Sequence, residues 1–302
     1  MVINIMVINI IISIIGIIDI IMSRFAYVTV IYGNNIYLTG ALVLGYTLSK
    51  TKTNFDRIIL VTPDTSKEYR DYLAEYYTHV IPIDYIEASS EIFSETDTRF
   101  TDVFTKLQCL SLIEYDKIIL MDLDMVVTRN FDHIFKLIAP AACLKRYYYP
   151  FGKKIPGKFI CDGNKLVGSI NAGLMLLKPD LKELSEIKSD IINNQQLNKY
   201  KYPEQDYLSL RYCDKWTSIT FNYNFQFGLT NRVKKYHYKA NDIYVIHYSS
   251  SYKPWNLLIK NRKIESEEKK FTDLHKKYYD LWLDIYKHIR QEFSKKNIEL
   301  PY

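Results

Sequence analysis

The chain of 302 residues contains little cysteine, glycine or proline, and the few cysteines already exclude two kinds of site. The four cysteines form no CxxC pair and have no histidine at zinc-finger spacing, so neither a structural zinc site nor a dense disulfide framework is indicated. They are Cys109, Cys143, Cys161 and Cys213. We expect four reduced, mostly buried thiols, which favours a cytosolic setting.

Charge of one sign is not concentrated in any long tract of the sequence. Lys and Arg number 40 against 34 Asp and Glu, which gives a net charge of +6. The mixture excludes a nucleic-acid-binding tract, and no nucleic-acid partner is expected. A mildly positive field still favours an anionic ligand such as a nucleoside diphosphate.

The first 22 residues form an isoleucine-rich, low-complexity run that is long enough to span a bilayer. Asn4 and Asp19 interrupt the run, and no Lys or Arg precedes it. Three interpretations stay open: a membrane anchor, an additional strand or helix, and an upstream extension with the functional start at Met22. We favour the extension, because a strand that needs no prefix begins at Phe25. A cytoplasmic location is expected, with membrane association through residues 1–22 as the alternative.

From Phe25 onward, short apolar runs alternate with amphipathic stretches. This pattern is typical of an α/β domain with a mostly parallel central sheet, here a single Rossmann-like domain over residues 23–255. The expected strands cover residues 25–31, 57–62, 79–83, 117–121, 170–177 and 243–246, and the expected helices cover 37–50, 66–76, 180–194, 204–212 and the segment after Arg99.

Three further segments carry structural expectations. The strand over 170–177 is expected to break at Asn171-Ala172-Gly173, and residues 147–168 are expected to form a loop that could lie over a ligand. Residues 256–302 should form a helical appendage that packs on the domain, on a partner subunit or on a membrane surface. Its apolar stripe consists of Phe271, Leu274, Tyr278, Leu281, Ile285 and Ile289.

Two carboxylates follow the strand over 117–121, Asp122 and Asp124, with Leu123 between them. Ligands of open α/β sheets bind at the carboxyl ends of the strands. Two carboxylates there can hold a divalent cation that bridges two phosphates. A solvated turn would carry the same triplet, so its weight depends on the neighbouring motifs.

A second motif follows another apolar strand, which ends at His247. An isolated histidine is usually a packed core residue. Here Lys253-Pro254-Trp255 follows six residues later, and the lysine ammonium can contact phosphate oxygens. The imidazole can bind a metal, so this segment is a second candidate for a metal and phosphate site.

Short motifs in a fixed order connect these segments to a known family. They are Ala26–Val30 with Gly40–Gly45, Thr105-Lys106-Leu107, Met121–Asp124, Asn171-Ala172-Gly173, Glu204-Gln205-Asp206, and His247 with Lys253-Pro254-Trp255. In these motifs the chain resembles the glycogenin-like retaining glycosyltransferases of family 8, which include galactinol synthases and lipopolysaccharide galactosyltransferases. The resemblance implies a GT-A fold and transfer of a hexose (glucose, galactose or N-acetylglucosamine) from a UDP-sugar to a hydroxyl acceptor.

The resemblance also implies a metal centre. Asp122, Asp124 and His247 would bind Mn²⁺, with Mg²⁺ as the alternative, and the cation would stabilise the departing diphosphate. Lys253 would add a second positive contact. Ser250 stands where the family often has a phosphate-contacting glycine.

Further donor contacts follow from the same resemblance. The residues implied are Val30, Tyr32 and Tyr37 around the base with Asn34 as a polar partner, Leu123, the basic pair Arg99 and Lys106, and Asn171, Ala172 and Gly173 against the sugar hydroxyls. Stacking of an aromatic ring on uracil is expected, and the alternative is that these tyrosines are ordinary core or surface residues.

Glu204-Gln205-Asp206 is the implied catalytic element, together with Lys106. A side-chain oxygen beneath the anomeric carbon would stabilise an oxocarbenium-like transition state. Because Gln205 is a poor nucleophile, front-face transfer is favoured. The acids of this triplet also suit a helix N-terminus, and both interpretations can hold together.

Several alternatives stay open. A self-glycosylating primer would need an acceptor near Thr230, Tyr236 or Tyr238, and a non-catalytic sugar-nucleotide-binding protein would keep the fold without turnover. A nucleotidyltransferase would need a Gly-rich loop, which Gly33-Asn34-Asn35 does not supply. The acceptor is a glycan, a protein or a small molecule, and homodimerisation through 256–302 is a hypothesis.

Overall fold

The structure, a computed structural model, describes residues 23–87, 102–145, 147–163, 165–193, 197, 200–226, 242–259 and 273–302. Residues 1–22 lie outside this part, so the anchor and extension interpretations stay predictions, as do the boundaries at 23–255 and 256–302. None of the helices in the described ranges combines the length and the apolar character that crossing a membrane requires.

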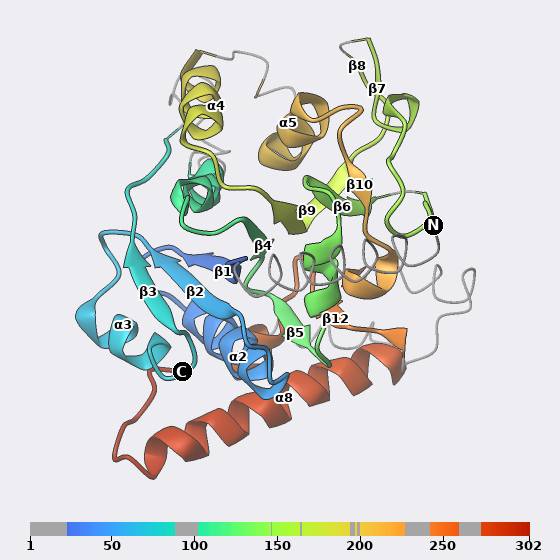
Figure 1. Ribbon diagram of the computed structural model, residues 1–302. Helices are drawn as coiled ribbons and strands as arrows, with labels where there is room; N and C mark the ends of the chain where they lie inside the picture. Colours follow the sequence, from blue (N-terminus) through green and yellow to red (C-terminus); the bar gives the residue numbers. More distant parts are fainter. Residues whose placement is uncertain are drawn as a thin grey trace, which may run out of the picture.

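A seven-stranded sheet forms the centre of the fold, in the order β10-β6-β9-β4-β1-β2-β3 (Figure 1). Its strands are β1 (Phe25–Ile31), β2 (Asp56–Val61), β3 (His79–Pro82), β4 (Lys117–Met121), β6 (Ala141–Leu144), β9 (Ile170–Leu177) and β10 (Thr217–Ser218). The strands β1 to β4 run parallel, as do β6 and β10, whereas β9 runs antiparallel to both neighbours. The predicted α/β fold with a mostly parallel sheet is confirmed.

Helices cover both faces of this sheet (Figure 1). One layer holds α2 (Tyr37–Lys50), α3 (Lys67–Leu73) and α8 (Asp273–Ser294), and the other holds the 3₁₀ helix η2 (Val103–Ser111), α4 (Leu181–Asn193) and α5 (Pro203–Arg211). Side chains alternate across a strand, so Ile58 and Leu60 of β2 pack toward η2, α4 and α5. Their neighbours Ile59 and Val61 pack toward α2, α3 and α8.

The strand β9 is continuous where a break was predicted at Asn171-Ala172-Gly173. The pairing of β9 with β6 is irregular: Ala142 pairs with Met175, but the next residue, Cys143, pairs with Asn171. The pairing of β9 with β4 continues without a shift. The predicted break was wrong, because the irregularity affects one edge of the strand and leaves the other edge hydrogen-bonded.

The segment 147–168 contains short elements in place of a plain loop, namely η4 (Gly157–Phe159), β7 (Cys161–Asp162) and β8 (Lys165–Leu166). Cys161 forms a disulfide with Cys213, which lies just beyond α5. The expectation of four reduced thiols was therefore wrong, and the two cysteines outside the disulfide, Cys109 and Cys143, are buried. Because the partners are 52 positions apart, their spacing gave no sign of the bond, and the thiol argument for a cytosolic setting loses its basis.

The C-terminal helix α8 packs along α2 at the bottom of the view in Figure 1. Its buried residues are Tyr278, Tyr279, Trp282, Tyr286, Ile289 and Phe293. The predicted stripe included Leu281, which is 37% exposed. The helix turns Trp282 and Tyr286 inward, because aromatic side chains bury more apolar area than leucine does. Phe271 lies outside the described residues.

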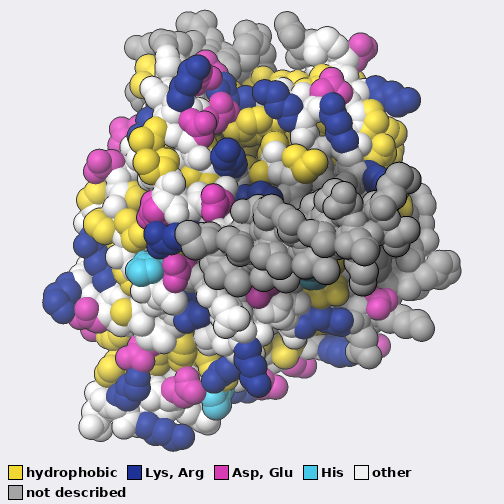
Figure 2. All heavy atoms as spheres, viewed as in Figure 1, with side chains coloured by type: hydrophobic (Ala, Val, Ile, Leu, Met, Phe, Trp, Pro, Cys, Tyr) yellow, Lys and Arg dark blue, Asp and Glu magenta, His cyan; other side chains and the backbone are white. Residues whose placement is uncertain are grey.

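Charged side chains of both signs are interspersed over the face seen in Figure 2, with apolar side chains between them. The net charge of +6 is therefore not gathered into one basic surface among the described residues of this face.

Candidate active site

The candidate site begins where β4 ends. The turn Asp122-Leu123-Asp124 leads from β4 into a small sheet of β11 (Phe225–Gln226), β12 (Val245–His247) and β5 (Met125–Val127). The backbone N–H of Asp122 donates to the Gly173 carbonyl at 2.8 Å, and the N–H of Tyr248 donates to the Asp124 carbonyl at 2.8 Å. These hydrogen bonds hold the turn between the two sheets.

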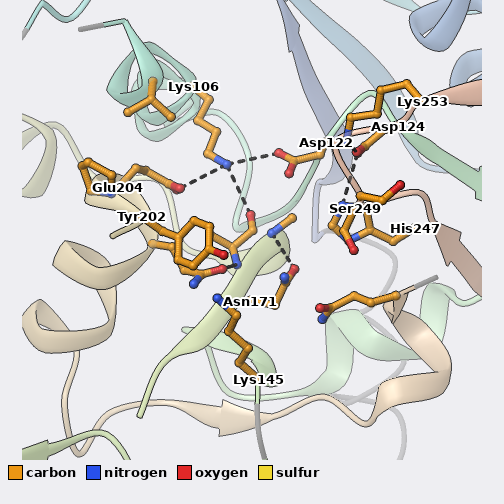
Figure 3. A pocket seen from close by; sticks show the side chains of 17 residues that line it. Lys106, Asp122, Asp124, Lys145, Asn171, Tyr202, Glu204, His247, Ser249 and Lys253 are labelled. Carbon is orange, nitrogen blue, oxygen red and sulfur yellow. Dashed lines mark hydrogen bonds and ion pairs between the residues drawn. The ribbon is translucent and has the colours of Figure 1, made fainter. Parts of the chain in front are cut away.

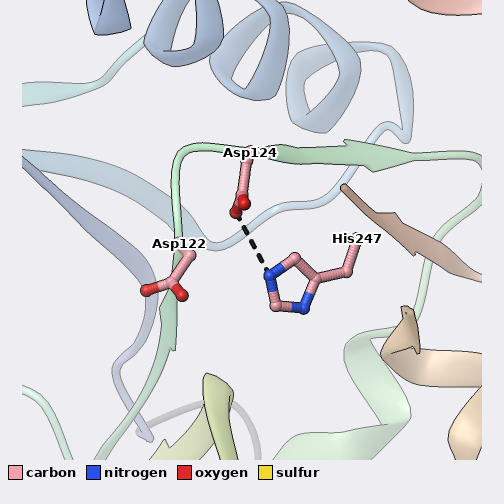
Figure 4. Close-up of side chains that lie close together, drawn as sticks. All are labelled: Asp122, Asp124 and His247. Atoms are coloured by element: carbon pink, nitrogen blue, oxygen red, sulfur yellow. Dashed lines mark ion pairs between the residues drawn. The ribbon is translucent and has the colours of Figure 1, made fainter. Parts of the chain in front are cut away.

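Three potential metal ligands meet at this turn. Asp122, Asp124 and His247 each offer a ligand atom, and these atoms all lie within 4.8 Å of one another. Figure 4 shows both carboxylates and the imidazole converging on one space, with His247 arriving from β12. His247 pairs with Met125 across the small sheet, which explains why residues so far apart in the sequence meet.

Hydrogen bonding selects the tautomer of His247. Its Nδ1 lies 2.7 Å from Asn224 Oδ1, while Asn224 Nδ2 donates to Asn171 Oδ1 at 2.7 Å. The same Asn171 oxygen also accepts from the N–H of Gly173 at 3.0 Å, which orients the chain of amides. Asn224 Oδ1 must then accept from Nδ1–H, and the lone pair of Nε2 is left for a metal.

With the proton on Nδ1, the surroundings of His247 Nε2 show whether a cation fits the site. His247 Nε2 lies 3.2 Å from Asp124 Oδ1, so two electron-pair donors face each other. Among the described residues that oxygen has no hydrogen-bond partner, although it is buried. A bound cation would remove this conflict, and an imidazole with two carboxylates suits Mn²⁺. The residues present therefore fit a divalent metal.

Lys253 stabilises the charge of Asp124. Its Nζ donates to Asp124 Oδ2 and, at 2.9 Å, to the Tyr248 carbonyl. Burial opposes the charged form of Asp124, but the pKa of this carboxyl lies below its ordinary range, because the Lys253 ammonium favours the ionised form. Asp124 is therefore ionised and ready to bind a cation.

Lys106 links the candidate metal ligands to α5 (Figure 3). Its Nζ lies 3.1 Å from Asp122 Oδ1 and 3.3 Å from Glu204 Oε2. Burial alone would lower the pKa of Lys106, but the two carboxylates raise it above its ordinary value. The lysine therefore keeps its charge within the site.

Glu204 is nearly fully buried, and its pKa differs from the ordinary value of a glutamate. Burial, reinforced by the Asp122 carboxylate and opposed by Lys106, raises the pKa of Glu204 to about 7. Among the described residues its Oε1 has no hydrogen-bond partner. A hydroxyl group in the cavity would supply the missing donor.

Two adjoining cavities open on either side of the candidate metal ligands. The tyrosine cavity, about 400 Å³, is lined by Val30, Tyr32, Asn35, Tyr37 and Leu123 among others. The polar cavity, about 390 Å³, is lined by Lys145, Asn171–Gly173, Tyr202–Gln205, Gln226, His247, Ser249 and Ser250 among others. Both include Val103, Lys106, Asp122, Asp124 and Lys253, so the two cavities are ends of one cleft.

Most of the predicted donor residues line one of these cavities, but Asn34 faces away from the cleft. Its Oδ1 accepts from the N–H of Ser66 at 2.9 Å, ahead of α3. Asn35 lines the tyrosine cavity instead, with its Nδ2 donating to the Tyr32 carbonyl at 2.7 Å. Arg99 lies outside the described residues, as do the candidate acceptors at 230, 236 and 238.

The predicted catalytic triplet lines two different cavities. Glu204 and Gln205 line the polar cavity, while Asp206 lines a separate cavity that shares Tyr202 and Lys145 with it. The oxygen and nitrogen of the Gln205 amide can be assigned in two ways, and in the first the oxygen accepts from the Ala172 N–H at 3.4 Å. In the second, the oxygen accepts from Lys145 Nζ at 3.3 Å and the nitrogen donates to the Ile170 carbonyl at 3.2 Å. In both assignments the amide is held at the wall of the cavity.

Asn224 was missed by the sequence analysis. Its signal is a period of two in Phe221–Gln226, where Asn222, Asn224 and Gln226 alternate with aromatic residues. Such alternation is typical of a strand with one polar face.

Comparison with solved structures identifies the fold. A galactosyltransferase, LgtC, in complex with donor and acceptor sugar analogs superposes with a TM-score of 0.57 at 15% identity, covering 90% of this chain and 99% of that chain. The glycosyltransferase GlyE of Streptococcus pneumoniae TIGR4 superposes with a TM-score of 0.54 at 20% identity, covering 92% of this chain and 65% of that one, just under two thirds. The fold is that of the GT-A glycosyltransferases.

Sequence comparison defines the family. The profile of glycosyl transferase family 8 matches residues 28–258. Uncharacterized protein R707 of Acanthamoeba polyphaga mimivirus is 66% identical over 281 residues, covering 93% of this chain and 100% of that protein. Galactinol synthase 1 of Solanum lycopersicum is 26% identical over 271 residues, covering 87% of this chain and 83% of that protein.

The chain therefore belongs to glycosyl transferase family 8 and is a glycosyltransferase. The resemblance found in the short motifs is confirmed. Enzymes of this family generally use a nucleotide sugar, a divalent metal and an acceptor, and the Asp122, Asp124 and His247 cluster is a candidate site for the metal.

Proposed function

We propose that this glycosyltransferase moves a hexose from a UDP-sugar to a hydroxyl group with retention of anomeric configuration. The observation that carries the proposal is the position of Asp122, Asp124 and His247 at the junction of the tyrosine cavity and the polar cavity. A diphosphate joins base to sugar, so ligands for its cation belong between the two. The tyrosine cavity then takes the base, and the polar cavity takes the hexose.

The cation we propose is Mn²⁺, with Mg²⁺ as the alternative. An imidazole ligand favours the transition metal, since Mg²⁺ prefers an all-oxygen shell. When bound, the cation supplies positive charge that stabilises the departing nucleoside diphosphate. Lys253 and Ser250 line the same stretch of the cleft, and the Lys253 ammonium adds a phosphate contact.

The base pocket follows from the residues of the tyrosine cavity. Val30, Tyr32 and Tyr37 provide apolar and aromatic surface for uracil, and the Asn35 amide stands where the sequence analysis expected Asn34. Tyr37 is 43% exposed, which leaves much of its side chain accessible to a ligand. Uridine is therefore the nucleoside we propose.

The wall built by β9 and α5 faces the hexose. Gln205 and Glu204 offer side-chain oxygens that stabilise positive charge developing at the anomeric carbon, and Lys106 holds Glu204 in place. In front-face transfer the bond from the anomeric carbon to the diphosphate oxygen breaks. The acceptor oxygen then bonds to the same face of that carbon, and the acceptor proton passes to the departing phosphate oxygen.

Donor turnover tests this function. The protein is incubated with Mn²⁺ and UDP-glucose, UDP-galactose or UDP-N-acetylglucosamine, and release of UDP is followed with and without hydroxyl acceptors. We expect release from one donor, and a loss of more than about 100-fold in Asp124→Ala, because a direct metal ligand matters more than a group that orients one. The matched control is Asp162→Ala, an exposed carboxylate on β7, which should keep full activity.

Two outcomes would contradict the proposal. If the protein binds UDP in the presence of Mn²⁺ but releases no UDP from any UDP-sugar, it is a nucleotide-binding protein without the proposed hexosyl transfer. A product with inverted anomeric configuration, seen by NMR, would refute retention. Intact mass after incubation with donor separates transfer to the chain itself from transfer to an added acceptor.

A further inference from the structure

The polar cavity contains a buried hydrogen-bond donor that the proposed mechanism does not use. Gln226 is 5% exposed and lines this cavity. Across the described part of the chain, its amide nitrogen Nε2 has no hydrogen-bond partner. An unpaired buried amide costs stability, and such groups recur where a ligand supplies the missing acceptor.

The small sheet directs this amide toward the metal ligands. Gln226 pairs with His247 in the parallel register of β11 and β12. Phe225 packs into the apolar cluster with α8, so its neighbours Asn224 and Gln226 turn to the opposite side. Asn224 contacts His247 there, and Gln226 continues the same polar face into the cavity.

The charges around Gln226 define what its amide can recognise. Lys106 is paired with Asp122 and Glu204, and Lys253 is paired with Asp124. Gln226 adds a neutral donor to a wall on which these charges already have partners. A neutral N–H donor of this kind selects a hydroxyl oxygen by a directed hydrogen bond.

We propose that Gln226 is a specificity-determining residue whose Nε2 donates a hydrogen bond to a hydroxyl oxygen of the carbohydrate in the polar cavity. Two carbohydrates share this chemistry, the transferred hexose and the acceptor. The inference rests on the proposed function, because it requires a sugar in the cavity.

The test compares Gln226→Met with the wild type. Methionine keeps the length of the side chain and removes the donor, and Gln226→Glu gives a second variant of the same shape without N–H groups. Calorimetric titration with Mn²⁺ present gives the affinities for UDP and for the UDP-hexose that the wild type uses. The KM for an added polyol acceptor, lactose or myo-inositol, is measured in the transfer reaction. The control is Gln108→Met, because the Gln108 amide is also buried but donates at 2.8 Å to the Asp84 carbonyl, away from the cleft.

Unchanged affinity for UDP shows that each variant is folded, because Gln226 lines the polar cavity and not the tyrosine cavity. A fall of roughly 10-fold in UDP-hexose affinity in both variants supports the proposal and identifies the transferred hexose. An unchanged UDP-hexose affinity with a roughly 10-fold higher acceptor KM supports it and identifies the acceptor.

The proposal is overturned if UDP-hexose affinity and acceptor KM both stay within twofold of the wild type. Where the wild type uses neither polyol, unchanged UDP-hexose affinity suffices to overturn it. Equal losses for UDP and UDP-hexose would overturn it as well, since Gln226 would then act through the metal ligands or the fold. A wild type that binds UDP but turns over no donor contradicts the proposed function itself, so the two failures are distinguishable.

Discussion

The hydrogen bond from His247 to Asn224 leads to a prediction about metal affinity. Asn224 is fully buried, and its side chain joins His247 Nδ1 to Asn171 Oδ1 through two contacts of 2.7 Å. In Asn224→Ala the imidazole loses the acceptor that keeps its proton on Nδ1. The proton can then move to Nε2, which lies 3.2 Å from Asp124 Oδ1, and the resulting hydrogen bond competes with the metal.

The expected magnitude follows from the role of Asn224. Loss of a group that orients a metal-bound histidine lowers metal affinity by about 10- to 100-fold, which corresponds to about 1.4–2.7 kcal/mol. Two buried hydrogen bonds are lost as well, so the free energy of unfolding should fall by roughly 1–3 kcal/mol. The variant should therefore stay folded while its metal affinity falls.

The assay is titration of Mn²⁺ in the presence of UDP, with free Mn²⁺ followed by its electron paramagnetic resonance signal. The matched control is Asn222→Ala, two residues earlier, whose amide donates to the Asp242 carbonyl at 3.1 Å. An Mn²⁺ affinity within twofold of the wild type in Asn224→Ala, together with a lowered thermal midpoint, would refute the tautomer argument and leave Asn224 with a structural role.

Two further predictions concern protonation and the disulfide. Burial, with Asp122 adding to it and Lys106 opposing it, raises the pKa of Glu204 from 4.5 to about 7, so the folded state favours the protonated acid. The stability of the metal-free wild type relative to Glu204→Gln should therefore fall as pH rises from 4.5 to 7. The measurement is the difference in thermal midpoint between the two proteins, and an equal difference at pH 5 and pH 8 would contradict the prediction. Cys213→Ser should lower the free energy of unfolding in urea by about 2–4 kcal/mol, because the bond to Cys161 closes a long loop. Reduced wild type should match this variant, and equal stability of oxidised and reduced wild type would show that the bond does not stabilise the fold.

Local sequence patterns predicted much of the fold, because they depend on near neighbours. The apolar run of β4 followed directly by Asp122 and Asp124 placed two carboxylates at a strand end, and the run before His247 did the same for the imidazole. Ser66 was predicted to begin a helix, and its side chain accepts from the N–H of Tyr69 ahead of α3. Each of these inferences needs a few consecutive residues and a known period.

Predictions that depend on the direction in which a side chain points were less accurate. Asn34 and Asn35 are adjacent and chemically identical, yet the turn at Gly33, with φ of +55°, directs Asn34 to Ser66 and Asn35 to the tyrosine cavity. Composition cannot distinguish the two, since the choice depends on backbone dihedrals.

By itself, the sequence determined the α/β class, the strand ends that carry the carboxylates and the imidazole, and the motifs of family 8. Only the tertiary structure decided which distant groups meet: Asn224 with His247, Lys106 with both Asp122 and Glu204, and Cys161 with Cys213. The physical reason is that periodicity reports which side of an element is buried. Contact distances across the cleft depend instead on sheet order, strand register and the packing of helices, which no local pattern contains.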